Sequence, residues 1–350
     1  RRVDDGLGRR PHGPIATKAA THPASCPVLK TFQVRKCRQG TGTLGGANCC
    51  NTTRQKKNGT TEYVNIAAEK LLQLKSFKEN KYSGSHVLET YRSNASNLLS
   101  VIKRVKKEGF SVYRMSSNLF PLFDLISEDI KNDSTLLNTL SSIGFFVTQN
   151  NMRVTFHPDQ YCVLSSDSES VVANSVKILD YHAWVMDRMN LPESPFYAIN
   201  VHGGKRGNSD KLVAAIEALP QNIRSRLTLE NDESCYSVSQ LFDVYKRTNT
   251  PIVFDSHHHT FNDGGMSGEQ AFEMSCQTWS GVKPITHLSN TEPGMEKDSF
   301  MNRRKHSDYV HYIPDWQLNA NNAGLIDIDF EFKMKNLAIA KAKKDFSIVV

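Results

Sequence analysis

Short apolar segments alternate with longer segments of helical periodicity over most of the chain. Segment 252–254 is typical, because Ile252, Val253 and Phe254 are all apolar and Asp255 and three histidines follow at once. A continuous apolar segment of this length is typical of a strand that is buried on both faces. The other segments of this kind cover 110–115, 153–156, 197–201, 227–229, 285–288 and 326–332.

Helical patterns lie between these segments. Val87, Leu98, Ile102 and Val105 repeat at helical spacing, and Gly109 ends the predicted helix. Further helices are predicted near 168–189, 210–219, 238–247, 268–279 and 334–342. Strands that alternate with helices favour a parallel sheet in an α/β fold. Seven clear strands and a weak one near 41–48 predict one TIM-type (β/α)8 barrel domain over residues 41–350.

An open, doubly wound sheet is the alternative architecture. The barrel is favoured because ligand-type side chains follow almost every predicted strand, and only a closed ring brings all strand ends to one face. The same reasoning selects 153–156 over 145–147 as the second clear strand, because 153–156 leads directly into His157.

Residues 1–40 lack sustained periodicity and are rich in Gly, Pro, Arg, Thr and Ser, so we expect a mostly disordered basic arm. Residues 1–60 carry about +10 and the remainder about −3. The arm therefore suits a targeting segment or a nucleic-acid contact. Seven cysteines without a CxxC pair indicate reduced thiols in an intracellular protein. The expected compartment is the nucleus or mitochondrion if the protein is eukaryotic, and the cytoplasm otherwise. No apolar run approaches the length of a membrane span.

Histidines and carboxylates follow the predicted strands in sequence order. A single histidine at a strand end is more often a structural hydrogen-bonding residue, but the recurrence indicates a shared site. Nitrogen and oxygen ligands without cysteine suit Zn²⁺, Mn²⁺ or similar ions. The candidate ligands are His157, His202, Glu230, Asp255, His258, His287, His306 and Glu331.

Two details of this ligand set stay open. In the run 257–259 the middle histidine is the first choice, because His258 follows Asp255 by three residues, but His257 or His259 can substitute. His182 lies within a helical pattern, and a packing role is favoured for it. A carboxylate such as Glu230 can bridge two cations, and a cation pair about 3.5–4 Å apart is a common device for phosphodiester hydrolysis.

Several side chains near these ligands suit nucleic acid. Gln160 and Tyr161 follow the first ligand histidine, as either an ordinary exposed turn or a wedge that stacks on bases. The candidate phosphate contacts are Arg114, Lys333, Arg303, Arg304 and Lys305, although most basic surface residues are only solvated charges.

Together these motifs resemble the UV damage endonucleases over about residues 86–340, and more weakly from 42. The resemblance rests on FHPDQY (156–161), NVHGG (200–204), LTLENDE (227–233), VFDSHHHTFND (253–263), THLS (286–289), RRKHSDY (303–309) and DFEFK (329–333). The most specific part is LENDE followed by the D-x-x-H-H turn.

The resemblance implies a barrel enzyme that holds two or three divalent cations, with Mn²⁺ favoured and Zn²⁺, Mg²⁺ or Co²⁺ as alternatives. It implies incision of double-stranded DNA immediately 5′ to a cyclobutane dimer or 6-4 photoproduct, by a monomer without an obligate protein partner. The first ion would be held by His157, His202 and Glu230, the second by Glu230, Asp255, His287 and Glu331, and the third by His258 and His306.

Further roles follow from the same resemblance. Glu230, His287 and Lys333 are assigned to catalysis. Gln160 and Tyr161 would probe the lesion, and Asn51, Arg114, Arg303 and Arg304 would contact DNA.

Three positions depart from the family pattern. The first-strand segment 44–54 lacks the expected tyrosine, although Asn51 can take the asparagine role. Asn118 stands where some members have a histidine, and Ile285 stands where some have a modified lysine. Because the core ligands are complete, we expect an enzyme. The alternatives are an abasic-site endonuclease of the same barrel superfamily, a sugar isomerase-like barrel, and a non-catalytic DNA-binding relative.

Overall fold

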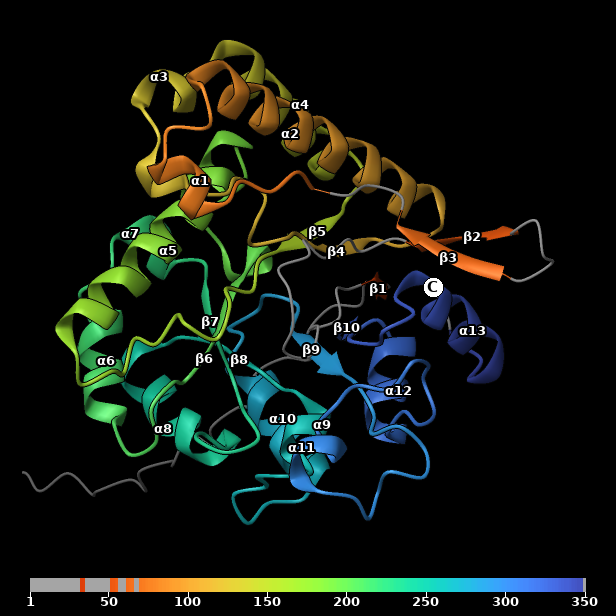
Figure 1. Ribbon diagram of the computed structural model, residues 1–350. Coiled ribbons are helices and arrows are strands. Elements are labelled where there is room, and N and C mark those ends of the chain that lie inside the picture. Colours follow the sequence, from red (N-terminus) through yellow and green to blue (C-terminus); the bar gives the residue numbers. More distant parts are fainter. Residues whose placement is uncertain (1–31, 35–50, 56–60, 66–68, 349–350) are drawn as a thin grey trace, which may run out of the picture.

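The computed structural model describes residues 32–34, 51–55, 61–65 and 69–348, and eight of its strands form a ring of parallel strands (Figure 1). In ring order they are β1 (Phe32–Val34), β4 (Val112–Arg114), β5 (Arg153–Thr155), β6 (Ile199–His202), β7 (Leu227–Glu230), β8 (Ile252–Val253), β9 (Ile285–Leu288) and β10 (Asp327–Phe330). Parallel bridges from Phe156 to Ile199 and from Asp255 to His287 join the two sheets, and β10 pairs with β1. The predicted TIM-type barrel is confirmed.

Helices surround this ring (Figure 1). Six of the longer ones were predicted: α2 (Gly84–Lys107), α5 (Glu169–Arg188), α6 (Ser209–Glu217), α8 (Val238–Thr248), α10 (Gly268–Gln277) and α13 (Asn336–Asp345). Two more, α4 (Ser134–Gln149) and α12 (Asp315–Asn322), were not predicted. Short turns of helix connect them: α1 (Leu74–Lys78), η1 (Phe123–Leu125), α3 (Glu128–Lys131), η2 (Pro195–Tyr197), α7 (Gln221–Arg224), α9 (Ser256–His259) and α11 (Phe300–Arg303). Residues 145–147 lie within α4, so 153–156 was the correct choice of strand.

The beginning of the barrel differs from the prediction. The weak segment 41–48 lies outside the described residues, and β1 holds the place between β10 and β4. β1 lies within the segment that the sequence assigns to a mostly disordered arm, and no strand was predicted at residues 32–34. A three-residue strand without a long apolar run gives almost no sequence signal, whereas two parallel partners fix its place. A separate antiparallel hairpin consists of β2 (Asn51–Gln55) and β3 (Thr61–Asn65).

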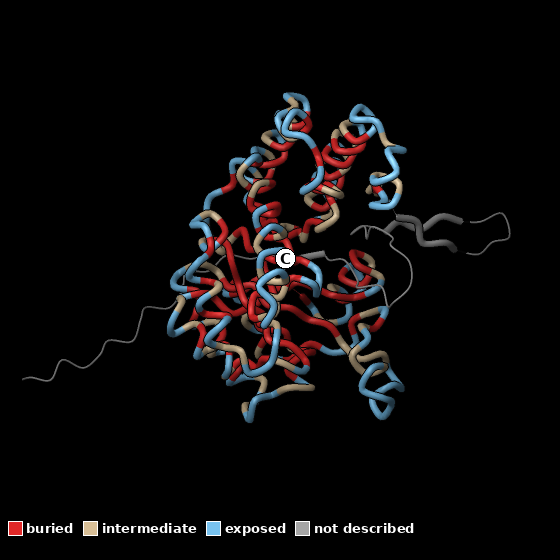
Figure 2. Tube along the Cα trace, turned by 60° about the vertical axis from the view of Figure 1, so that its left-hand side comes forward, coloured by how far each residue is buried: buried red, intermediate tan, exposed pale blue. Residues whose placement is uncertain are grey.

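Side chains of the ring alternate between the surrounding helices and the interior, as in other closed barrels. Val154, Leu229 and Ile328 belong to the apolar core that the helices complete. The intervening positions of these three strands are polar, as at Thr155, Glu230 and Asp329, whereas Val112, Val253 and Ile285 of other strands form a smaller apolar cluster. Figure 2 shows the buried residues in red along the strands and the inward sides of the helices. No helix within the described residues is long and apolar enough to cross a membrane.

The amino-terminal ends of the strands enclose a group of charges that we call the floor cluster: Arg153, Lys283 and Asp327. Arg153 Nη1 lies 2.9 Å from Asp327 Oδ2, and both side chains are only 1% exposed. Lys283 Nζ lies 2.8 Å from Asp327 Oδ1. Arg153 also donates hydrogen bonds to the carbonyl oxygens of Phe196 and Lys283. Every charge of the floor cluster therefore has an opposite charge within the chain.

Candidate metal centre

The carboxyl ends of the strands bring the predicted ligands together inside the barrel. His157, His202 and Glu230 come from the ends of β5, β6 and β7, and their ligand atoms lie within 4.8 Å of one another. His157 Nε2 is 2.8 Å from Glu230 Oε2, and the rings of His157 and His202 have centroids 5.0 Å apart. This group, here called the first donor group, matches the ligand set implied for the first ion.

A second donor group shares Glu230 with the first. It consists of Glu230, Asp255, His287 and Glu331, all buried, with one ligand atom from each within 4.8 Å of the others. His287 Nδ1 lies 3.0 Å from both Glu230 Oε1 and Glu331 Oε1. Asp255 Oδ1 accepts a hydrogen bond of 2.7 Å from the backbone N–H of His258, which leaves Oδ2 for the centre. Glu230 is therefore placed to bridge two ions.

The residues of the second group fit a divalent cation. Glu230 Oε1, Asp255 Oδ2 and His287 Nδ1 are buried, yet none makes a hydrogen bond of acceptable geometry within the described part of the chain. Buried polar atoms normally have a partner, because leaving one unsatisfied costs about 1–3 kcal/mol. Carboxylate oxygens and imidazole nitrogens are ligands for Mn²⁺ and Zn²⁺. A bound divalent cation would satisfy these atoms and offset their negative charge.

The electrostatics of the centre are set by this crowding of acids and histidines. Burial alone would raise the pKa of Glu230, but His287, His202 and His157 outweigh it and hold that pKa well below its usual range. Burial lowers the pKa of His258, but Asp255 and Glu230 outweigh it and raise that pKa to about 10. Both shifts show that the centre favours positive charge. A divalent cation would supply that charge more compactly than protons on imidazoles.

The third set of ligands is not assembled in the same way. No group of three ligand atoms forms around His258 and His306 within the described residues. His258 Nε2 lies 3.7 Å from Glu233 Oε2, and Arg304 forms an ion pair with the same carboxylate. His306 Nδ1 lies 3.7 Å from Glu331 Oε2, at the edge of the second donor group. The two histidines therefore border the centre, and their role as ligands of a third ion stays a prediction.

Supporting residues that the sequence analysis missed hold the carboxylates in place. Asn200 Nδ2 donates a hydrogen bond of 2.5 Å to Glu230 Oε2, and Thr228 Oγ1 donates one of 2.9 Å to Asn200 Oδ1. Asn231 exchanges two hydrogen bonds with the backbone of Asp255. The signal that could have found Asn200 is its position two residues before His202, on the same face of a strand.

The sequence analysis also missed Asp329, although it lies two residues before the predicted ligand Glu331. Asp329 is fully buried, and its Oδ2 lies 3.6 Å from His287 Nε2. Asp327, Asp329 and Glu331 alternate along β10 and beyond its end, so all three carboxylates point into the ring. A carboxylate on the far nitrogen of a ligand histidine orients the imidazole.

The predicted DNA contacts are spread around the centre. Gln160 is exposed and Tyr161 is 75% exposed, directly after the strand end that carries His157. Arg114 is mostly buried, and its Nη1 lies 3.5 Å from Glu331 Oε1, so it borders the second donor group. Lys333 is half exposed and lies 3.2 Å from Asp308, outside both donor groups. Arg303 and Arg304 lie in and after α11, and Asn51 belongs to β2, whose side chains are outside the description.

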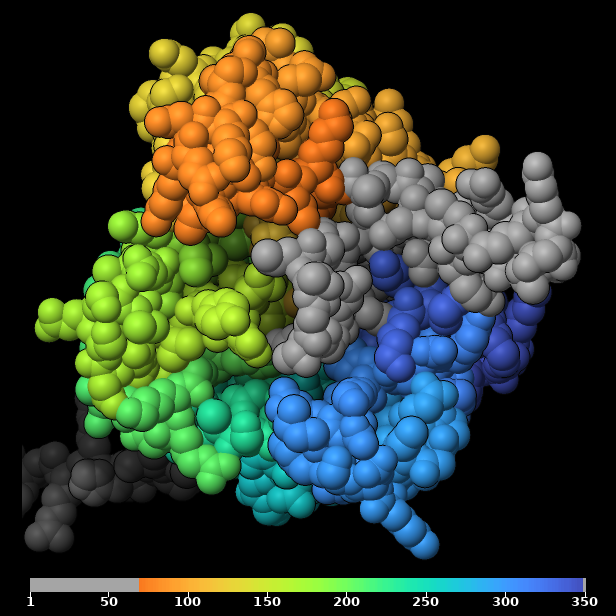
Figure 3. Space-filling model, viewed as in Figure 1, coloured from red at the N-terminus to blue at the C-terminus, as the bar shows by residue number. Residues whose placement is uncertain are grey.

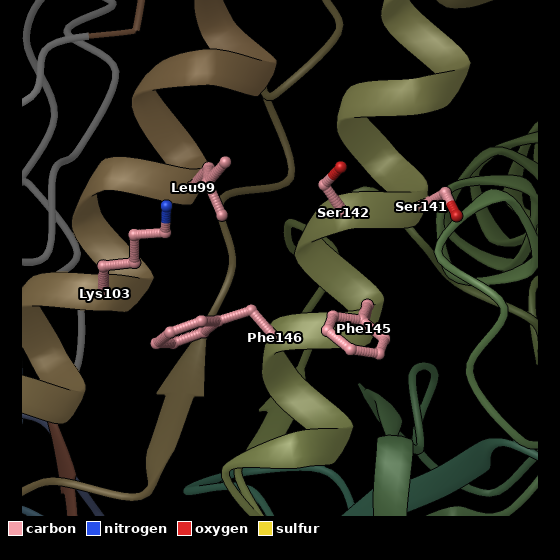
Figure 4. Close-up of a pocket in the computed structure, with 6 residues that line it drawn as sticks. All are labelled: Leu99, Lys103, Ser141, Ser142, Phe145 and Phe146. Atoms are coloured by element: carbon pink, nitrogen blue, oxygen red, sulfur yellow. The ribbon is translucent and has the colours of Figure 1, made fainter.

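A surface pocket of about 470 Å³ lies away from these residues, between α2 and α4. Figure 4 shows its lining, in which Phe146 of α4 extends toward Leu99 and Lys103 of α2. Ser141, Ser142 and Phe145 of α4 complete the lining. None of the donor-group residues lines this pocket. The chemistry therefore belongs to the mouth of the barrel, not to the pocket.

A parallel β/α barrel with a carboxylate shared by two buried donor groups defines the class of metal-dependent barrel enzymes. Within that class, the chain belongs to the UV-endonuclease UvdE family, whose model matches residues 48–349. The resemblance carried by the motifs is thus confirmed, and with it the expectation that this protein is an enzyme.

Relatives and solved structures agree with this assignment. The UV DNA damage endonuclease of Nostoc sp. is 34% identical over 305 residues, which cover 83% of this chain and 91% of the relative. The one of Deinococcus radiodurans is 33% identical over 74% of this chain and 86% of its own length. The crystal structure of SacUVDE has a TM-score of 0.68 at 28% identity and covers 80% of this chain and 94% of that one.

Endonuclease IV from Thermus thermophilus shares the fold alone. Its TM-score is 0.51 at 11% identity, with 71% of this chain and 92% of that chain covered.

Proposed function

We propose that this protein is a DNA repair endonuclease that nicks double-stranded DNA immediately 5′ to UV photoproducts, both cyclobutane dimers and 6-4 photoproducts. The observation that carries the proposal is the position of Glu230 in both donor groups, in a chain of the UvdE family. A shared carboxylate suits a pair of cations acting on one phosphodiester. An intracellular location, beside that DNA, is part of the same proposal.

The chain supplies the ligands and the positioning for this reaction. His157, His202 and Glu230 would hold one ion, and Asp255, His287 and Glu331 with Glu230 would hold the other. When bound, such divalent cations, with Mn²⁺ favoured, polarise the phosphate, lower the pKa of the attacking water and neutralise the leaving oxygen. Asn200 fixes Glu230 through one hydrogen bond, so the shared carboxylate keeps one orientation.

Recognition of the lesion would fall to exposed side chains at the mouth of the barrel. Tyr161 is a large aromatic residue that is 75% exposed beside a ligand histidine. An exposed aromatic ring can stack on an unpaired base at a distorted site. We propose that Gln160 and Tyr161 contact the damaged nucleotides while the donor groups hold the phosphate on their 5′ side.

A nicking assay tests this function. Purified protein with Mn²⁺ would be mixed with labelled duplexes that carry one cyclobutane dimer, one 6-4 photoproduct, one abasic site or no lesion. We expect a single cut directly 5′ to each photoproduct that disappears in EDTA. Cleavage of the abasic duplex alone would move the chain to the abasic-site endonucleases. No cut in any duplex, with metal bound, would identify a non-catalytic relative.

A further inference from the structure

The loop between β9 and α12 carries apolar side chains in solvent. We call residues 290–306, which include α11, the α11 loop. Met301 is 61% exposed, Met295 42% and Phe300 39%. Exposed large apolar side chains that gather in one short segment commonly mark a binding surface.

The α11 loop adjoins the metal centre. It ends at His306, whose Nδ1 is 3.7 Å from Glu331 Oε2. Arg304 forms an ion pair with Glu233, next to His258. Figure 3 shows the segment near residue 300, in light blue, on the same face of the molecule as the segment near residue 160, in lime. A duplex bound over the centre would therefore meet both segments.

The loop is firmly held on its inner side. The ring of Phe300 meets that of Phe261 edge-on with centroids 5.5 Å apart, and the guanidinium of Arg303 lies over Phe261 at 5.4 Å. Thr291 Oγ1 donates a hydrogen bond of 2.6 Å to the carbonyl oxygen of Arg303, and Thr291 forms an isolated antiparallel β-bridge with His306. These contacts hold the backbone of the α11 loop in place, while Met295 and Met301 remain exposed.

Positive charge accompanies these apolar side chains. Arg303, Arg304 and Lys305 follow one another at the end of α11. No ion pair involves Arg303 among the described residues, and its buried Nε makes no hydrogen bond there. Apolar wedges combined with arginine are typical of proteins that bind the minor groove, where the wedge packs on base steps and the cation contacts phosphate.

We propose that the α11 loop is a second DNA-contacting element, separate from Gln160 and Tyr161. Met301, supported by Phe300, would pack into the minor groove of the duplex flanking the incision, beside a phosphate held by Arg303, whose contact with DNA the resemblance already implies. This inference rests on the proposed function, because it takes DNA as the occupant. It predicts a contact that is independent of the lesion, since undamaged flanking duplex has the same groove and phosphates.

Binding measurements on three single variants test this inference. Met301→Ser removes the wedge, Arg303→Gln removes the charge, and Phe145→Ser is a matched control, because Phe145 is an exposed apolar residue at the α2–α4 pocket. Affinity would be measured by fluorescence anisotropy on an undamaged duplex and on a dimer duplex already nicked 5′ to the lesion, so that no reaction proceeds. Circular dichroism would verify that each variant is folded.

We expect Met301→Ser to weaken binding to both duplexes by about three- to tenfold, with an unchanged ratio between them. Arg303→Gln should lower the slope of log Kd against log salt by about one. Phe145→Ser should bind like the wild type. By contrast, Tyr161→Ala should lower the ratio between damaged and undamaged duplex.

The outcomes separate this inference from the proposed function. If the wild type nicks dimer duplexes while Met301→Ser and Arg303→Gln bind like Phe145→Ser, the α11 loop does not contact DNA and the function stands. If the wild type cuts no photoproduct duplex but both loop variants lose affinity, the DNA contact stands and the function is wrong. Failure of the wild type to bind any duplex would overturn both.

Discussion

The two ends of the barrel bury carboxylates equally deeply but compensate them differently. At the amino-terminal end, Asp327 lies between Arg153 and Lys283, so its charge is neutralised by the chain. At the carboxyl end, Glu230 and Asp255 are just as buried, but their ion-pair partners are histidines, which carry a charge only when protonated. An isolated buried charge is too costly to keep without a partner. The difference separates a structural ion pair from a group of side chains that fits a divalent cation.

The strongest test of this comparison is Glu230→Gln, because it removes the carboxylate shared by both donor groups. We expect nicking to fall by at least about a thousandfold, well beyond the 10–100-fold typical of residues that only support a ligand. Damaged-duplex binding should change little, since Glu230 is buried below the surface. Single-turnover nicking and anisotropy would measure both. Near-normal nicking would show that Glu230 does not bridge ions.

Asp327→Asn tests the other end of the barrel. Removing one partner of a buried pair leaves the other charge uncompensated, so the free energy of unfolding should fall by about 3–5 kcal/mol. Urea denaturation would measure this loss. Asp167→Asn is the matched control, because Asp167 pairs with Lys205 and Lys211 at the surface, where such pairs contribute at most about 1 kcal/mol. The metal content of the folded Asp327→Asn protein should equal that of the wild type. A lower content would show that metal binding at the carboxyl end depends on the floor cluster.

His182, which lies outside the donor groups, is a buried titratable group with no carboxylate partner among the described residues, and it should make stability depend on pH. His182 is buried on α5 against Phe156, and burial lowers its pKa to about 4. Because the unfolded histidine titrates near 6.5, the unfolded state binds the extra proton between pH 6.5 and 4. Stability should therefore be unaffected above pH 6.5 and fall by about 3 kcal/mol as pH drops to 4.

Thermal unfolding from pH 7.5 to 4 would measure this dependence in the wild type and in His182→Gln. The variant should lose the part of the pH dependence that His182 contributes. An identical slope in both proteins would show that His182 is not the group that titrates. Its packing role would then be unrelated to its charge.

The smallest effect is expected at Asn200, which acts on metal binding only through Glu230. Asn200→Ala removes the hydrogen bond to Glu230 and should lower metal affinity by about 10–100-fold. Isothermal titration with Mn²⁺ would measure the affinity, and excess Mn²⁺ should restore much of the nicking rate. Thr228→Val, which removes only the hydroxyl bonded to Asn200, should cost less. Unchanged affinity in Asn200→Ala would mean that the barrel alone orients Glu230.

The barrel and most of the donor groups could be predicted because strand and ligand are adjacent in sequence. His157, His202 and Glu230 each follow or end an apolar strand, so local pattern and chemistry point to one place. The partners of those ligands could not be predicted in the same way. Asn200, Thr228 and Asp329 are ordinary polar residues whose roles depend on which strand lies next to them in the ring.

Charged residues were harder to assign than ligands. The ion pair of Arg304 with Glu233 was not predicted, while its expected phosphate contact stays a prediction, and nothing in the local pattern around Arg153 indicates its burial in the floor cluster. Side-chain pairing inside the ring joins residues as far as 217 positions apart, as for Arg114 and Glu331, which no local pattern reveals. The first strand, β1, could not be predicted for a different reason, because three residues carry too little periodicity to be recognised.

The floor cluster also bears on the life of this protein when metal is scarce. Because Arg153 and Lys283 neutralise Asp327 without help from solution, the barrel has an internal framework that does not depend on ion supply. Removal of divalent ions should therefore leave the pairing at this end of the barrel unchanged. Any loss of stability in the metal-free protein would then originate at the carboxyl ends of the strands.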